Sequence, residues 1–235
     1  MNLVVELSPA ERAIYEKVRM SAIGEADSIA KLNDIQDQRF RILALLTRLR
    51  QIACHPRMVH DTWTEGSAKL TQLSETLMQL REEGHRVLVF SQFVKHLSLI
   101  REMMDAEGIT YQYLDGSTPA SSRQQEVDKF QNGDATAFLI SLKAGGTGLN
   151  LTAADYVIHM DPWWNPAVED QATDRAHRIG QDKPVMVYRI VAKDTIEEEI
   201  LKLHETKRDL VAGILDGTHS AAKLSTKDLI ELLRS

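Results

Sequence analysis

Cysteine is almost absent from this 235-residue sequence, in which Cys54 is the single example. One cysteine excludes an internal disulfide and any cysteine-rich metal site, and we expect no metal ligand set in this chain. The sequence also lacks a signal peptide, a lysine-rich targeting cluster and an apolar run long enough for a transmembrane helix. These absences favour a reducing, cytosolic compartment.

An excess of positive charge is missing too. The formal net charge is −6, so the chain cannot coat nucleic acid through its overall charge. Any contact with DNA must come from a local basic strip. Hydrophobic residues make up 43% and charged residues 26% of the chain, which is typical of an ordinary globular protein.

Two parts of a complete nucleotide site are absent as well. The chain contains no G-x-x-x-x-G-K-[ST] phosphate loop. No Asp-Glu pair ends an apolar strand in the way needed to hold Mg²⁺. The chain therefore lacks the parts that bind most of an ATP molecule.

Short apolar runs alternate with helical patterns between residues 66 and 194. We expect strands at 87–90, 111–114, 137–141, 154–160 and 185–191. Strand and helix in repeated alternation predict an α/β fold, a doubly wound parallel sheet with helices on both faces. Functional residues of such sheets gather beyond the carboxyl ends of the strands.

The flanking regions are predicted to be helical. Ser8-Pro9-Ala10-Glu11 combines an N-cap, a proline at the first helical position and an acid in the first turn. Thr195 caps a later helix in which acids precede bases, as the helix dipole prefers. We therefore divide the chain into a helical segment 1–65, a sheet domain 66–194 and a C-terminal helical brace 195–235.

One further helix is predicted to begin at Asn165. The Asn is the cap, Pro166 occupies the first helical position, and Gly180 ends the helix. Small apolar residues on one side of this helix are suited to lie flat on the sheet. They are Ala172, Ala176 and Ile179.

A second stripe of the same helix carries Gln171, Arg175 and Arg178 at i, i+4 and i+7. Two guanidinium groups would then project in the same direction. A guanidinium suits phosphate oxygens because it is planar, permanently charged and able to bond bidentately. An arginine aimed at a terminal phosphate stabilises the charge that develops during transfer. The alternative is a solvated face on which Arg178 pairs with Asp174.

A glycine-rich turn follows the strand at 137–141. The run from Lys143 to Asn150, KAGGTGLN, has three glycines within four positions. Its backbone N–H groups can approach an anion closely, and Thr147 adds a hydroxyl. An ordinary tight crossover between two strands is the alternative.

Several longer motifs occur in a specific order. SLKAGGTGLNL, DPWWNP and QATDRAHRIGQ lie between residues 141 and 181, after LRQIACHP at 49–56, VLVFSQF at 87–93 and YLDGST at 113–118. In this order and spacing they resemble the C-terminal RecA-like motor lobe of the Swi/Snf family of superfamily-two, helicase-like DNA translocases. The resemblance covers nearly the whole chain. Its compact pattern, without large insertions, favours a bacterial or archaeal member.

The resemblance implies that Arg175 and Arg178 are catalytic and reach an ATP that an N-terminal lobe of the same protein holds together with Mg²⁺. Gly146, Gly148 and Gln171 are assigned to ATP binding on the same ground. Because the family's pattern is already under way at Met1, we expect the chain to be one lobe of a longer protein. The isolated lobe is expected to be a monomer that binds no cofactor by itself and has negligible ATPase activity.

The resemblance also implies a grip on the phosphate backbone of double-stranded DNA. Hydroxyl groups and backbone N–H groups bond phosphate without reading bases, as a translocase requires. Trp164, with its neighbour Trp163, could supply a stacking group or a wedge, although packing inside the protein is an alternative. The other residues assigned to DNA are Gln92, Ser117, Thr118, Arg123, Lys143 and Thr147.

Two functions remain compatible with the sequence. The first is the second motor lobe of an ATP-dependent translocase on duplex DNA, and the second is a non-catalytic nucleic-acid or protein binding module with the same fold. The intact arginines at 175 and 178 favour the first. The expected location is the cytoplasm of a bacterium or archaeon, or the nucleus of a eukaryote.

Overall fold

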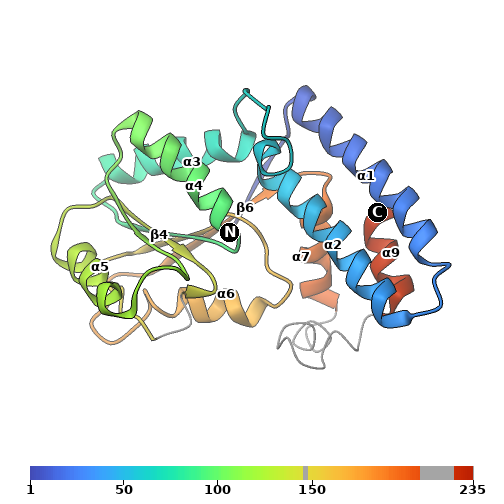
Figure 1. Ribbon diagram of the computed structural model, residues 1–235. Helices are drawn as coiled ribbons and strands as arrows, with labels where there is room; N and C mark the ends of the chain where they lie inside the picture. The colour runs from blue at the N-terminus through green and yellow to red at the C-terminus, as the bar shows by residue number, and fades with distance from the viewer. Residues whose placement is uncertain (145–147, 207–224, 235) are drawn as a thin grey trace. The chain divides into compact units, whose positions relative to one another are not determined.

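The computed structural model describes residues 1–144, 148–206 and 225–234 (Figure 1). The chain divides into two compact units. The sheet unit contains Met1–Val5, Lys69–Asp161 and Ala167–Val191, and the helical unit contains Glu6–Ala68, Pro162–Pro166 and Ala192–Ser235. Within the described ranges, no helix has the length and apolar character needed to cross a membrane.

The sheet has six strands in the order β1-β6-β5-β2-β4-β3. Pairing is parallel between β6 and β5, β5 and β2, β2 and β4, and β4 and β3. The central strands β2 and β4 are buried at every position, which explains their continuous apolar sequences. The strands are β1 (Asn2–Val5), β2 (Val87–Ser91), β3 (Tyr111–Leu114), β4 (Ala137–Ser141), β5 (Tyr156–His159) and β6 (Met186–Ala192).

Helices cover both faces of this sheet, as predicted. Helices α3 (Ala68–Glu82) and α4 (Val94–Glu107) lie on one face, and α5 (Ala120–Asn132) and α6 (Pro166–Thr173) lie on the other (Figure 1). Helix α4 ends at Gly108, whose φ of 65° is left-handed. The predicted α/β, RecA-like fold class is confirmed.

The edge strand β1 was not predicted, because residues 1–65 read as helical. It extends the sheet beyond β6 through two backbone hydrogen bonds of Met1. The Met1 amino group donates to the Val187 carbonyl at 2.7 Å, and the Met1 carbonyl accepts from Arg189 at 3.0 Å. A four-residue apolar strand has too little periodicity to be recognised without its partner.

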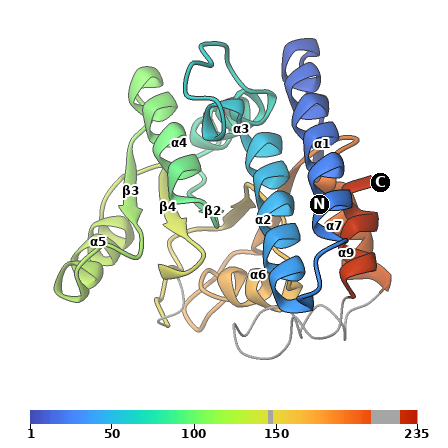
Figure 2. The same cartoon turned by 45° about the vertical axis from the view of Figure 1, so that its right-hand side comes forward.

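The helical unit contains α1 (Pro9–Ile29), α2 (Ile35–Cys54), the short 3₁₀ helix η1 (Pro56–Met58), α7 (Ile196–Thr206) and α9 (Thr226–Arg234). Figure 2 shows α1, α2 and α9 side by side. The predicted cap of α1 forms as a capping box, in which Ser8 and Glu11 bond each other's backbone. The core of this unit includes Tyr15, Leu46, Leu49 and Ile200.

Candidate functional site

Helix α6 is anchored on the sheet by an ion pair and by a histidine. The Glu169 carboxylate is fully buried and accepts from Arg189 Nε on β6 at 2.6 Å. At the end of β5, His159 Nε2 lies 3.3 Å from the hydroxyl oxygen of Thr173. Burial lowers the pKa of His159, so its ring is neutral at pH 7. These contacts fix the orientation of α6.

The helix predicted to continue to Gly180 ends at Thr173. The segment from 174 to 180 consists of turns. The carbonyl group of Arg175, which a longer helix would use internally, accepts the backbone N–H of Leu151 at 3.0 Å. The prediction is wrong because a loop satisfies the carbonyl groups that would otherwise continue the helix.

Arg175 and Arg178 consequently do not share one helical stripe. Arg175 is 3% exposed, and its Nε and Nη1 have no hydrogen-bond partner among the described residues. Arg178 is exposed and donates from Nη1 to the Gly148 carbonyl at 2.8 Å. Burial lowers the pKa of Arg175, and the charge of Arg178 lowers it further. The two guanidinium groups are therefore near each other but differ in environment.

The predicted apolar stripe is correct in part. Ala172 and Ala176 are buried, at 3% and 0% exposure. Ile179 is completely exposed, because it lies in the turns beyond the end of α6. Gln171 lies on the exposed side of α6.

Gln181 shapes the segment that carries the arginines. Its Nε2 lies 2.7 Å from the carbonyl oxygen of Ala154 and 3.1 Å from those of Thr152 and Ala176. Its Oε1 accepts the backbone N–H of Lys183 at 3.0 Å. The sequence analysis missed this role, although the glutamine ends the QATDRAHRIGQ motif.

The glycine turn and the arginine segment are hydrogen-bonded neighbours. Gly148 has a φ of 58°, a left-handed conformation that favours glycine, and its carbonyl receives Arg178. Lys143 is exposed at the start of the turn. Gly146 and Thr147, which were assigned to ATP and to DNA, lie outside the described residues.

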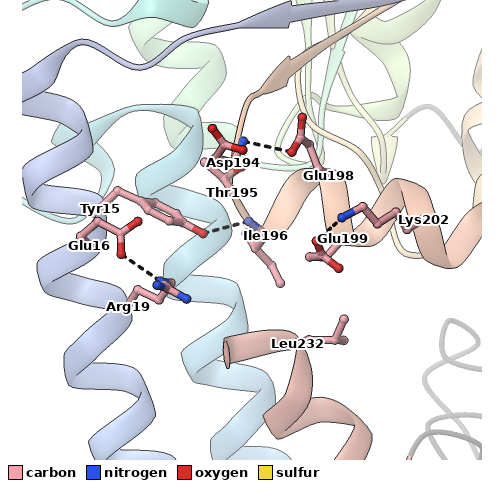
Figure 3. Close-up of a pocket in the computed structure, with 10 residues that line it drawn as sticks. All are labelled: Tyr15, Glu16, Arg19, Asp194, Thr195, Ile196, Glu198, Glu199, Lys202 and Leu232. Carbon is pink, nitrogen blue, oxygen red and sulfur yellow. Dashed lines mark hydrogen bonds and ion pairs between the residues drawn. The ribbon is translucent and has the colours of Figure 1, made fainter. Parts of the chain in front are cut away.

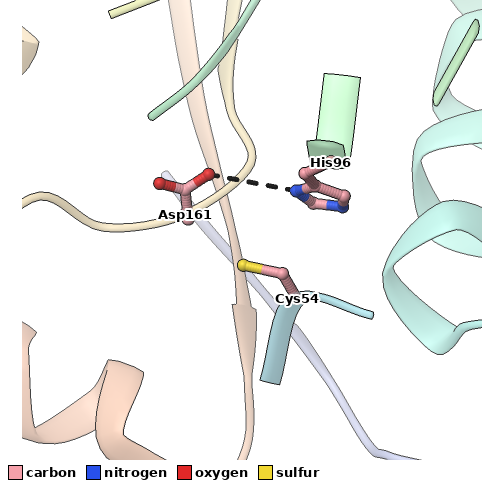
Figure 4. Close-up of side chains that lie close together, drawn as sticks. All are labelled: Cys54, His96 and Asp161. Carbon is pink, nitrogen blue, oxygen red and sulfur yellow. Dashed lines mark ion pairs between the residues drawn. The ribbon is translucent and has the colours of Figure 1, made fainter. Parts of the chain in front are cut away.

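Asp161 ties together the carboxyl ends of β2 and β5. It accepts the Ser91 hydroxyl at 2.5 Å and the backbone N–H of Gln92 at 3.3 Å. His96 Nδ1 on α4 lies 3.9 Å from the same carboxylate (Figure 4). Gln92, which was assigned to DNA, is therefore held in place at its backbone by a buried acid that the sequence analysis did not single out.

The turn after β3 is organised around Asp115. Its carboxylate accepts the Ser117 hydroxyl at 2.6 Å and the Tyr113 hydroxyl at 2.7 Å. The Thr118 hydroxyl accepts the Asp115 N–H at 3.1 Å, and Arg123 Nε donates to the Thr118 carbonyl at 3.0 Å. Burial alone would raise the pKa of Asp115, but these hydrogen bonds lower it on balance. The proton of the Ser117 hydroxyl is therefore engaged by the Asp115 carboxylate.

The residues assigned to DNA thus follow three strands that are neighbours in the sheet. The strand order β2-β4-β3 places the turns after these strands along one edge. These turns contain Gln92, Ser117, Thr118 and Lys143, and Arg123 supports them.

Trp164 does not lie where the sequence predicted. It is 8% exposed and belongs to the core of the helical unit. The Arg50 guanidinium lies 5.2 Å from its ring centroid. The assignment of Trp164 to DNA stacking is therefore corrected, since its ring is covered by protein. Trp163 is only partly buried.

A separate pocket of about 320 Å³ lies in the helical unit (Figure 3). Its lining combines acids with bases that are already paired. Arg19 Nε lies 2.9 Å from Glu16, and Lys202 Nζ lies 2.6 Å from Glu199. Phosphate would have to compete with these carboxylates, so the pocket is a poor nucleotide site.

Comparison with known proteins decides the family. The family model for the helicase conserved C-terminal domain matches residues 68–180. The solved C-terminal domain of the Sulfolobus solfataricus SWI2/SNF2 ATPase is 31% identical, with a TM-score of 0.78 over 99% of this chain and 96% of that chain. This chain belongs to the Swi2/Snf2 family. Within the family it corresponds to the C-terminal RecA-like lobe.

Other relatives are longer than this chain. The S. solfataricus SWI2/SNF2 ATPase core in complex with double-stranded DNA is 32% identical, with a TM-score of 0.80, over 99% of this chain and 49% of that chain. An uncharacterized ATP-dependent helicase of Mycoplasma pneumoniae is 38% identical over 98% of this chain. The chain spans 22% of the length of that relative.

Proposed function

We propose that the chain is the second motor lobe of an ATP-dependent translocase on double-stranded DNA. In this proposal Arg175 and Arg178 reach ATP that an N-terminal lobe of the same protein holds with Mg²⁺. The observation that carries the proposal is the buried guanidinium of Arg175, whose Nε and Nη1 have no partner among the described residues.

A buried guanidinium with unsatisfied nitrogens is costly, and a partner of opposite charge that arrives during function would offset this cost. The terminal phosphates of ATP fit this requirement, because their oxygens accept several charge-assisted hydrogen bonds. Burial, and then repulsion by the charge of Arg178, also lower the pKa of Arg175. An anion placed between the two arginines would relieve both.

Arg178 has a weaker partner that it can exchange. Its Nη1 donates to the Gly148 carbonyl, a neutral acceptor, and its side chain is exposed. A phosphate oxygen is a stronger acceptor for a guanidinium than a carbonyl group. We assign Arg178 to the charge that develops on the terminal phosphate of ATP, and Arg175 to the phosphate next to it. Gln171 on α6 and Gly148 on the glycine turn are also assigned to ATP binding.

The DNA grip is proposed along the carboxyl edge of the sheet. The donors there are hydroxyl, amide, ammonium and guanidinium groups, which bind phosphate without reading sequence. The Ser117 hydroxyl would have to exchange Asp115 for a phosphate oxygen. Their arrangement on neighbouring turns suits a continuous backbone, and the related S. solfataricus core was solved with double-stranded DNA. The proposed residues are Gln92, Ser117, Thr118, Arg123 and Lys143, with Thr147 outside the described residues.

ATP, when bound, supplies the phosphoryl group whose transfer to water releases the free energy for movement. The residues of this chain orient that group and neutralise its charge, and buried contacts hold them in place. Glu169 with Arg189 fixes α6, and Gln181 fixes the arginine segment. Because the arginines only complete a site held elsewhere, the lobe alone is expected to have negligible turnover.

The test is Arg178→Ala in the full-length parent protein. DNA-stimulated ATP turnover is expected to fall at least about a hundredfold, because an arginine finger contributes roughly 10³–10⁵ in rate. DNA affinity is expected to stay within about twofold, since Arg178 is not assigned to DNA. Arg81→Ala, an exposed arginine on α3, is the matched control and should leave turnover unchanged. Normal turnover in Arg178→Ala would remove the proposed finger.

A further inference from the structure

Residues 148–154, between the glycine turn and β5, form the surface against which both proposed arginines are bonded. We call them the supporting segment. The Gly148 carbonyl accepts Arg178 Nη1 at 2.8 Å, and the Leu151 N–H donates to the Arg175 carbonyl at 3.0 Å. The first bond holds a guanidinium and the second holds a backbone position, and all four residues belong to the sheet unit. A displacement of the supporting segment would therefore move both arginines.

The C-terminal end of the supporting segment is fixed by its continuation into β5. There the Asp155 N–H donates to the Arg86 carbonyl at 3.2 Å. Leu151, which faces the Arg175 carbonyl, lies four residues before this anchor. Gln181 bonds the supporting segment at Thr152, but Gln181 belongs to the stretch that also carries the arginines. That bond ties the arginines to their support without fixing the support itself.

Gln131, at the end of α5, fixes the supporting segment from the body of the sheet unit. Its Oε1 accepts the Ala153 N–H at 2.8 Å, and its Nε2 lies 3.2 Å from the hydroxyl oxygen of Thr152. Helix α5 is itself anchored next to this glutamine, because Phe130 is fully buried with its ring centroid 5.2 Å from that of Phe138 on β4. One amide thus joins a fixed helix end to two consecutive residues of the supporting segment.

We propose that Gln131 is a positioning residue for the nucleotide reaction. By holding Thr152 and Ala153 it fixes the supporting segment, and through that segment the backbone of Arg175 and the guanidinium of Arg178. The inference rests on the proposed function and adds to it a residue that touches neither nucleotide nor DNA. Every contact in this chain of bonds lies within the sheet unit.

The experiment uses the full-length parent protein with Gln131→Met, which keeps the length of the side chain but loses both hydrogen bonds. Turnover number is expected to fall about tenfold, because misplacement by about 1 Å can cost roughly a hundredfold and the segment keeps its anchor at β5. Affinities for ADP and for DNA should not change. Gln125→Met, the same substitution on the exposed side of α5, is the matched control and should leave turnover unchanged.

Two further variants test whether the hydrogen bonds are responsible. Gln131→Glu keeps an acceptor for the Ala153 N–H, and the Thr152 hydroxyl can donate to the carboxylate, so this variant is expected to recover most of the lost rate. Thr152→Val removes one of the two bonds and should cause a smaller loss than Gln131→Met. Combined with Gln131→Met it should add nothing, because both substitutions break the same contact.

A transition-state analogue separates positioning from general damage. ADP with aluminium fluoride mimics the phosphoryl group during transfer, the stage at which the arginines are proposed to act. Gln131→Met should therefore weaken inhibition by this analogue about tenfold while leaving inhibition by ADP alone within about twofold. A purely structural role would weaken both inhibitors or neither.

Two results would overturn the inference. One is a Gln131→Met protein with normal turnover and normal inhibition by the analogue. The other is a loss of turnover in which ADP, the analogue and DNA all bind more weakly, since that pattern reports general damage. If Arg178→Ala keeps full turnover, the proposed function itself fails. If Arg178→Ala loses turnover while Gln131→Met is normal, only the role of Gln131 is refuted.

Discussion

At the scale of single residues, the two arginines of the DRAHRIGQ motif differ in a way that their spacing does not reveal. Arg175 is buried, and its Nε and Nη1 have no hydrogen-bond partner in the part of the chain that the structure describes, whereas Arg178 is exposed and bonded to a carbonyl group. Burial of a guanidinium without partners destabilises the folded lobe. The folded lobe is therefore expected to be less stable with Arg175 than with an apolar side chain of similar volume at this position.

This difference predicts that Arg175→Met stabilises the isolated chain. Removing a buried charge whose Nε and Nη1 lack partners among the described residues should raise the free energy of unfolding by about 1–2 kcal/mol, because methionine fills similar volume without the desolvation cost. Urea unfolding measures the change. The same substitution should abolish ATP turnover in the parent protein. A methionine variant less stable than the natural chain would show that Arg175 is already satisfied in the folded lobe.

Asp115 predicts a dependence of stability on pH. Hydrogen bonds from Ser117 and Tyr113 lower its pKa despite burial. A lowered pKa contributes stability that is complete above the ordinary aspartate pKa of about 4 and is lost as pH falls through the lowered value. Unfolding experiments between pH 7 and pH 3 should show a smaller loss of stability for Asp115→Asn than for the natural chain. Equal losses in the two proteins would contradict this assignment.

At the scale of elements, the segment after α6 depends on one side chain rather than on helix propensity. Gln181 Nε2 reaches the carbonyl groups of Thr152, Ala154 and Ala176, of which the last two residues are fully buried. The bonds to the carbonyl groups of Ala176 and Arg175, from Gln181 and Leu151, take the place of hydrogen bonds within a longer helix. The arginine segment is therefore built from contacts between elements.

Gln181→Ala should consequently destabilise the chain by about 1–3 kcal/mol, because it leaves buried carbonyl groups without a donor. Gln171→Ala, on the exposed side of α6, is the matched control and should change stability by less than about 0.5 kcal/mol. The shift in urea midpoint at constant slope is the measurement. Equal effects of the two substitutions would mean that Gln181 does not support the segment.

The same elements show what a sequence can predict. The apolar runs of β2 to β6 and the periodicity of α4 are local, so the approximate positions of these elements and the α/β class follow directly from them, whereas the short β1 was missed. The end of α6 is decided by partners far away in sequence, such as Leu151, which no local pattern contains. The burial of Arg175 and Trp164 likewise depends on tertiary packing. The motif spacing singled these residues out as candidates, but it could not predict how exposed their side chains are.

At the scale of the whole molecule, the proposed function makes this chain one side of a shared nucleotide site. The ATP-dependent helicase relative from M. pneumoniae is several times longer, since the chain covers 22% of it. In the proposed function, motor activity needs a second lobe, and this chain contributes the arginines and a phosphate-binding edge. The central claim is that the arginine segment of this chain approaches the nucleotide.

Photo-crosslinking in the parent protein tests that claim most directly. An ATP analogue with a short photoreactive group on its terminal phosphate is bound in the presence of double-stranded DNA, irradiated, and the labelled peptides are identified by mass spectrometry. The account predicts label on the peptide containing residues 174–182, and its loss when unmodified ATP competes. Label confined to residues outside this chain, in a protein with normal turnover, would contradict it.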